Sequence, residues 1–164
     1  MADTSPRTIA FTVNGEPRSV PADEDTPLLA VLRNVLGLRA ARFGCGHEQC
    51  GACMVLVDGE PVYSCTRPID TLEGKAVTTP EGIGTAAAPH PLQAAILAEQ
   101  AAQCGYCLSG IIVSAKALLD KRPNPSRAEI VAALDPHLCR CGSHTRIVRA
   151  VERAAAALRG EAHP

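Results

Sequence analysis

Along the first half of the chain, apolar and polar residues alternate in short runs, which is the pattern of β-strands with one buried face. Residues 9–13 alternate in this way, Asn14-Gly15 follows as a hairpin turn, and residues 18–20 form the returning strand. A second hairpin is predicted over residues 54–63, and residues 76–79 form a last short strand. We therefore expect the first half to be rich in β-structure.

One helix is predicted among these strands. Thr26-Pro27 is a helix start, with Thr as the N-cap and Pro at the first helical position, and Gly37 stands where a C-terminal cap belongs. Between them, four apolar residues fall on one face of a helix and are expected to pack on the core: Leu28, Leu32, Val35 and Leu36.

The second half follows a helical pattern instead. His90-Pro91 begins a first helix, and an apolar stripe over residues 108–119 predicts a second helix that ends near Pro123. Residues 126–129 have the form of a capping box at the start of a third helix. Residues 147–151 carry the apolar positions of a fourth helix, which runs into an Ala-rich end.

The change of pattern divides the chain. Residues 80–89 are rich in Gly, Ala and Pro, as is typical of a linker. We therefore predict an α+β protein with a β-rich domain over residues 1–80, a linker over residues 81–89 and a four-helix domain over residues 90–164.

Composition and charge narrow the possible functions. The formal net charge is −1 and the basic residues are scattered, which argues against nucleic-acid binding. No run of about 18 or more apolar residues occurs, and residues 1–7 are polar, so neither a transmembrane helix nor a secretory signal is expected. We expect a cytoplasmic protein, with a periplasmic or membrane-associated place open if a partner carries it there. In a reducing compartment, eight cysteines indicate metal binding, not disulfides.

The first four cysteines are separated by four, two and eleven residues: Cys45, Cys50, Cys53 and Cys65. The first three have the spacing of plant-type [2Fe–2S] proteins, in which a short loop wraps the cluster and a fourth thiolate arrives from elsewhere. Gly44, Gly46 and Gly51 let the backbone come close to the cluster. Structural zinc prefers two paired knuckles, which this run does not form. His47 is interpreted as a loop residue because four cysteines already complete the site.

The second four cysteines are separated by two, thirty-one and one residue: Cys104, Cys107, Cys139 and Cys141. Each pair directly precedes a predicted helix, so two helix starts meeting at one end of a bundle would bring four thiolates together. Helix N-termini also favour the negative charge of thiolates. From spacing alone, both a cluster and a zinc ion remain open for this set.

Three motifs resemble a known family: Gly44-Cys45-Gly46 with Cys50-Gly51-Ala52-Cys53, Gln103-Cys104-Gly105-Tyr106-Cys107, and Cys139-Arg140-Cys141-Gly142. They are similar to the small subunit of xanthine oxidase-family molybdenum hydroxylases. The resemblance implies a plant-ferredoxin-like β-grasp domain followed by a four-helix-bundle domain, each with one [2Fe–2S] cluster. It also implies a large partner subunit that binds molybdopterin, with Gln103 in contact with the pterin; the alternative for Gln103 is a helix-cap amide.

Two departures from the common family pattern, Leu108-Ser109-Gly110 and Gly142-Ser143-His144, resemble the branch of nicotinate dehydrogenase and isoquinoline oxidoreductase small subunits. This resemblance implies hydroxylation of an N-heteroaromatic, or aldehyde oxidation, in the partner subunit. It also implies that the electron acceptor is a cytochrome c or an FAD subunit. His144 is expected to be a plain helix-start residue.

No residue of this chain is a credible acid, base or nucleophile, so the expected role is electron transfer. The alternatives are a free-standing ferredoxin-like carrier and a zinc-stabilised interaction module.

Overall fold

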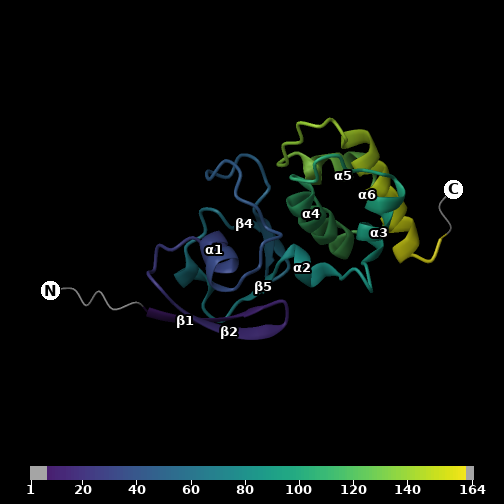
Figure 1. The fold of residues 1–164 in the computed structure, drawn as a ribbon. Helices are drawn as coiled ribbons and strands as arrows, with labels where there is room; N and C mark the ends of the chain where they lie inside the picture. The colour runs from purple at the N-terminus through teal and green to yellow at the C-terminus, as the bar shows by residue number, and fades with distance from the viewer. Residues whose placement is uncertain (1–6, 162–164) are drawn as a thin grey trace.

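A computed structural model describes residues 7–161 of the 164-residue chain. The polar N-terminal stretch and the end of the predicted helical domain therefore lie partly outside the described residues. The chain is α+β, with a mixed sheet from the N-terminal half and helices from the C-terminal half (Figure 1). No helix within the described residues combines the length and the apolar character needed to cross a membrane.

The sheet has five strands in the order β2-β1-β5-β3-β4. They are β1 (Arg7–Val13), β2 (Glu16–Ala22), β3 (Met54–Val57), β4 (Glu60–Tyr63) and β5 (Ala76–Thr78). Strands β1 and β5 pair in parallel, and the other neighbours pair antiparallel.

Both predicted hairpins are confirmed. Asn14 and Gly15 have φ values of 54° and 82°, and Asp58 and Gly59 have φ values of 50° and 85°. Two left-handed residues in a row match the twist of the flanking strands, which is why Asn-Gly and Asp-Gly mark such turns.

The predicted helix after residue 26 is shorter and less regular than expected. The α-helical part, α1, covers only Leu28–Ala30, with Pro27 and not Thr26 as its N-cap, and a π-helical turn, η1, follows over Val31–Val35. The wider turn rotates the end of the segment, so Val35 is 59% exposed and not part of the core face.

Part of the predicted linker is helical. The short helix α2 (Pro80–Ile83) begins with Pro at its first position and is tied back to the N-terminal half. Glu81 accepts a hydrogen bond from the Ala40 N–H at 2.7 Å, and the Asn14 side chain accepts one from the Thr79 N–H at 2.9 Å.

The four predicted helices of the C-terminal half are confirmed as α3 (Pro91–Ala98), α4 (Leu108–Lys121), α5 (Arg127–Leu134) and α6 (His144–Leu158). His90 caps α3 and Ser126 caps α5, each in a capping box with the residue three positions on. These caps satisfy N–H groups that have no partner inside the helix.

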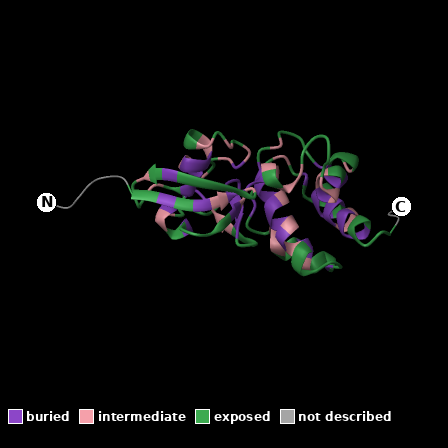
Figure 2. Cartoon of the chain, turned by 90° about the horizontal axis from the view of Figure 1, so that it is seen from below, coloured by how far each residue is buried: buried purple, intermediate pink, exposed green. Residues whose placement is uncertain are grey.

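Apolar side chains of the sheet and of the α1–η1 segment form one cluster, and those of the C-terminal helices form a second. Figure 2 shows buried residues in both halves. A smaller third cluster joins the two halves, because Val113 and Ala117 of α4 pack on Met54 and Leu56 of β3. At the start of α4, the Ser109 hydroxyl donates to the Ala52 carbonyl at 3.0 Å, so this end of the helix lies beside the loop that precedes β3.

Candidate metal centres

The first cysteine set gathers at the open end of the β3–β4 hairpin. Cys53 directly precedes β3 and Cys65 follows β4, so the pairing of Met54 with Tyr63 brings the two cysteines side by side. The Cys65 thiol contributes to the shifted pKa of Cys53, so the two thiols lie close together, and both side chains are buried. The Ser64 hydroxyl donates to the Cys53 carbonyl at 2.6 Å and holds the hairpin end.

Cys45 and Cys50 lie in the loop between η1 and β3, where backbone N–H groups point at their sulfurs. The Cys45 N–H donates to Cys50 Sγ at 3.4 Å, and the Gln49 N–H donates to Cys45 Sγ at 3.2 Å. Gly44 permits this close wrapping, because a Cβ at that position would lie 2.5 Å from Cys50 Sγ. The loop turns through Gly46, which has a φ of 75°.

These surroundings give the thiols of the first set different pKa values. Backbone N–H donors, foremost that of His47, lower the pKa of Cys45 to about 6, whereas burial raises the pKa of Cys53 to about 11. His47 contributes its backbone to the sulfur while its side chain is exposed. The first set therefore consists of a surface pair rich in N–H donors and a buried pair.

The second set joins two loops of the helical half. Cys104 and Cys107 lie between α3 and α4, and Cys139 and Cys141 lie between α5 and α6. The sulfurs of Cys104 and Cys141 are 3.4 Å apart. The Cys139 thiol contributes to the shifted pKa of Cys107, so these two thiols also lie close together. All four cysteines line one small cavity.

The second set shows the same contrast between surface and buried thiols. Burial raises the pKa of Cys107 to about 12. The Tyr106 N–H donates to the exposed sulfur of Cys104 at 3.5 Å and lowers the pKa of that thiol.

The two donor sets fit [2Fe–2S] clusters. In each set the sulfurs approach two by two, and a [2Fe–2S] cluster needs four thiolates divided between two irons. A single zinc ion instead draws four ligands to one point at about 2.0–2.3 Å. The pairwise arrangement therefore favours two-iron units at both positions.

The two sets adjoin each other although they come from different halves of the chain. The Leu138 N–H donates to the Cys50 carbonyl at 3.1 Å, and the Arg42 guanidinium donates to the Gly105 carbonyl at 2.8 Å. A cleft of about 230 Å³ at this junction is lined by cysteines of both sets. The sequence motifs gave no indication of this contact.

A buried histidine at the junction was not identified from the sequence. His137 is 5% exposed, and its Nε2 lies 2.7 Å from the Ser114 hydroxyl of α4. Burial lowers the pKa of His137 to about 4, against a smaller opposite effect of the Gly51 backbone. No local pattern marks this residue, because its partners lie in two other segments of the chain.

Gln103 lies exposed in the loop before Cys104. Its Nε2 donates to the Cys141 carbonyl at 3.2 Å, so it connects the two loops of the second set. It is not a helix cap, because the N-cap of α4 is Cys107. His144 is the first residue of α6, as predicted.

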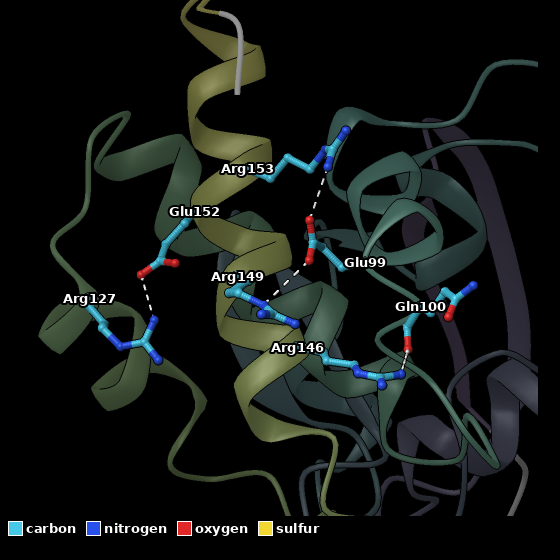
Figure 3. Close-up of polar contacts among 7 residues, drawn as sticks. All are labelled: Glu99, Gln100, Arg127, Arg146, Arg149, Glu152 and Arg153. Atoms are coloured by element: carbon cyan, nitrogen blue, oxygen red, sulfur yellow. Dashed lines mark hydrogen bonds and ion pairs between the residues drawn. The ribbon is translucent and has the colours of Figure 1, made fainter. Parts of the chain in front are cut away.

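Arginines of α6 hold the segment that leads to the second set (Figure 3). Arg149 and Arg153 both pair with Glu99, at 3.5 and 3.1 Å, and the Arg146 guanidinium donates to the Gln100 carbonyl at 3.3 Å. Gln100 has a φ of 47°, so these contacts fix a left-handed turn immediately before the loop that carries Gln103 and Cys104.

Comparison with known proteins identifies both halves. A model of the 2Fe-2S iron-sulfur cluster binding domain matches residues 11–83, and a model of the [2Fe-2S] binding domain matches residues 79–152. The chain is 53% identical to one subunit of the nicotinate dehydrogenase of Pseudomonas putida, over 90% of this chain and 94% of the relative. It is 51% identical to the alpha subunit of the isoquinoline 1-oxidoreductase of Brevundimonas diminuta, over 90% and 97%.

Solved structures agree with these relatives. Quinoline 2-oxidoreductase from Pseudomonas putida 86 superposes with a TM-score of 0.88 at 34% identity, over 97% of this chain and all of the matched chain. Aldehyde oxidoreductase from Desulfovibrio desulfuricans superposes with a TM-score of 0.91 at 44% identity, over 94% of this chain and 17% of the matched chain.

Proposed function

Since the chain belongs to the small [2Fe–2S] subunits of xanthine oxidase-family molybdenum hydroxylases, we propose that it relays single electrons within such a complex. The observation that carries this proposal is the division of the eight cysteines into two adjoining sets, each with sulfurs that meet in pairs. The match extends over nearly the whole length of relatives that are themselves separate subunits.

The cluster ligands in this proposal are Cys45, Cys50, Cys53 and Cys65 for the first cluster, and Cys104, Cys107, Cys139 and Cys141 for the second. When bound, each cluster supplies a centre that accepts or releases one electron. The chain contributes the thiolates and the N–H donors that stabilise added negative charge near Cys45 and Cys104. It also contributes a dry shell around Cys53 and Cys107, which limits solvation of the cluster and so affects its potential.

We propose that the two sites have an order. Gln103 is exposed beside the second set, and its side-chain oxygen accepts no hydrogen bond from the described residues. This position suits contact with a pterin held by a large subunit. Electrons would arrive on this side and leave from the side of Cys45, through the loop that carries exposed Phe43.

We also propose that the chain consists of two cluster domains, a β-grasp domain over residues 1–80 and a four-helix domain over residues 90–164, joined by residues 81–89. The separate apolar clusters of the two halves and the two matching domain models support this division. The short helix α2 makes the first part of the connection structured.

The names of the relatives suggest the chemistry of the complex. Nicotinate, isoquinoline and quinoline are N-heteroaromatic compounds, so we propose that the large partner subunit hydroxylates a substrate of this class. The acceptor that takes the electrons from this chain would be a cytochrome c or an FAD-binding subunit.

Metal analysis of matched cysteine variants tests the two sites. The chain purified with its partner should contain about four irons and four acid-labile sulfides, and each of Cys65→Ser and Cys107→Ser should lose about half of both. Electron paramagnetic resonance of the dithionite-reduced complex should show two signals, of which each variant removes a different one. Zinc without iron, or one signal in the unchanged chain, would contradict the assignment.

A second experiment tests the position of Gln103. Gln103→Ala should slow reduction of the second cluster by substrate and shift its reduction potential, while the first cluster keeps its potential. Gln49→Ala, an exposed glutamine in the other cysteine loop, is the matched control and should change neither measurement. Equal behaviour of the two variants would remove the pterin contact from the proposal. Turnover of an N-heteroaromatic by the purified chain alone would refute the whole assignment.

A further inference from the structure

His137 occupies the point where three segments of the chain meet. Its imidazole is 5% exposed and makes a 2.7 Å hydrogen bond through Nε2 to the Ser114 hydroxyl, which is itself 5% exposed on α4. The other ring nitrogen, Nδ1, is buried against the Gly51 backbone, and that approach does not have the geometry of a hydrogen bond, so Nδ1 has no hydrogen-bond partner among the residues that the structure describes. A buried polar group with an unused nitrogen costs stability, so its presence calls for a role.

The unused nitrogen faces the first cysteine loop. A Cβ on Gly51 would lie 2.2 Å from His137 Nδ1 and 2.8 Å from the Pro136 carbonyl oxygen. A Cβ on Gly110 of α4 would lie 1.9 Å from the Gly51 oxygen and 3.0 Å from the imidazole. The loop, the helix and the segment before Cys139 are thus packed so tightly that no methyl group fits between them. The imidazole ring fills the space that remains and sets the distance between these backbones.

The residues next to this contact connect the two cysteine sets. Cys50, a member of the first set, precedes Gly51, and Leu138 lies between His137 and Cys139 of the second set. The Leu138 N–H donates to the Cys50 carbonyl at 3.1 Å. One interpeptide hydrogen bond therefore joins a ligand of one site to the neighbour of a ligand of the other.

We propose that His137 is a positioning residue: anchored by Ser114, it holds the Gly51 turn against the Leu138–Cys139 segment and so fixes the distance between the two cluster sites. The proposal rests on the proposed function, because it concerns the separation of the two clusters. Electron transfer between two centres weakens steeply as they move apart, so a rigid spacer at this junction keeps the exchange fast. The role is mechanical and needs no proton transfer by the imidazole.

Three variants in the assembled, cluster-loaded complex test this proposal. His137→Ala removes the spacer, Ser114→Ala removes its anchor, and His137→Gln keeps a side-chain amide that reaches the Ser114 hydroxyl. Ile130→Ala is the matched control, because Ile130 is a fully buried core residue of α5 that is not among the junction contacts. It should lower stability without changing the junction.

The first measurement is hydrogen exchange at the Leu138 amide. Exchange should become several-fold faster in His137→Ala and Ser114→Ala, remain near the unchanged protein in His137→Gln, and be unaffected in Ile130→Ala. The second is pulsed electron paramagnetic resonance of the fully reduced complex, in which the dipolar interaction between the two clusters should weaken or broaden in the same two variants. A purely structural role would lower the unfolding temperature and leave this interaction unchanged.

Each outcome decides the matter. Unchanged Leu138 exchange and unchanged dipolar interaction in His137→Ala overturn the proposal, as does an equal change in Ile130→Ala. If His137→Ala fails to fold or to hold clusters, Ser114→Ala, which retains the imidazole, decides by the same two measurements. Absence of iron from the unchanged chain would refute the proposed function itself. The positioning role is tested separately, by comparing the exchange rate of the Leu138 amide in the variants with the rate in the unchanged chain.

Discussion

Replacement of Glu99 by Gln tests how the segment before the second cysteine set is held. Glu99 pairs with both Arg149 and Arg153 of α6, and its side chain is only 17% exposed (Figure 3). At separations of 3.1 and 3.5 Å, each pair has a gross Coulomb attraction of about 5 kcal/mol at an effective dielectric constant near 20. Desolvation offsets most of this attraction, so we expect a net loss of about 1–2 kcal/mol for Glu99→Gln.

The matched control is Glu152→Gln on the same helix. Glu152 makes a single pair with Arg127 at 2.9 Å and is 30% exposed, so its net contribution should be below about 1 kcal/mol. For a chain of this size, the loss in Glu99→Gln corresponds to a fall in unfolding temperature of roughly 2–8 °C, measured by circular dichroism. Hydrogen exchange over residues 99–107 should increase in Glu99→Gln and not in Glu152→Gln.

Equal unfolding temperatures for the two variants would refute this reasoning, since the doubly paired and less exposed carboxylate would then contribute no more than the singly paired one. Unchanged exchange over residues 99–107 would also refute it, because the α6 arginines would not be holding that segment. Raising the salt concentration should reduce the difference between the variants, because salt screens partly exposed pairs.

Substitutions at two further positions have outcomes that the structure fixes. Gly110→Ala should lower the free energy of unfolding, measured by urea titration, by about 1–3 kcal/mol, because its Cβ would lie 1.9 Å from the Gly51 oxygen. This loss outweighs the helix preference of alanine over glycine, which is about 1 kcal/mol. A more stable variant would contradict this reasoning. His90 caps α3 by accepting a hydrogen bond from the Leu92 N–H at 3.1 Å. Burial, aided by Lys116, lowers the pKa of His90 from the ordinary 6.5, so the folded chain binds fewer protons than the unfolded chain. The contribution of His90 to stability therefore declines as pH falls below about 6.5. In urea titrations at pH 5 and 8, His90→Asn should keep the cap and reduce the pH dependence of stability, leaving the part that comes from buried His137, whose pKa is also lowered. His90→Ala should lose about 1 kcal/mol at pH 8. A pH dependence in His90→Asn equal to that of the unchanged chain would contradict the contribution of His90.

The parts of the fold that the sequence predicted are those decided within a few residues. Asn14-Gly15 can adopt two left-handed conformations in a row, and the Ser126 hydroxyl and Glu129 carboxylate can satisfy the first turn of a helix without help from elsewhere. The π-helical turn η1 was not predictable in this way, because the apolar spacing of the segment also suits a regular helix. Packing against the sheet decides between them, and packing is not a local property.

In the candidate site too, the features that depend on nearby residues were predictable and those that depend on distant segments were not. Spacing was enough to group the first four cysteines, since three share one loop and Cys65 follows a predicted hairpin. The second set required α3–α4 and α5–α6 to place their loops together, which spacing cannot state. The contact among His137, Gly51 and Gly110 depends on three segments at once, and a glycine that is needed because a distant histidine lies against it looks like any loop glycine in the sequence.

The packing of α4 on β3 has a consequence for dividing the chain. The exposed loop over residues 85–89 is the natural place for a cut, but each half would then expose one side of the apolar contact formed by Met54, Leu56, Val113 and Ala117. Two separately produced fragments should therefore aggregate alone and recover when mixed, because each hides the apolar side of the other. The two fragments should therefore complement each other without a covalent connection, with the β3–α4 contact as the interface between them.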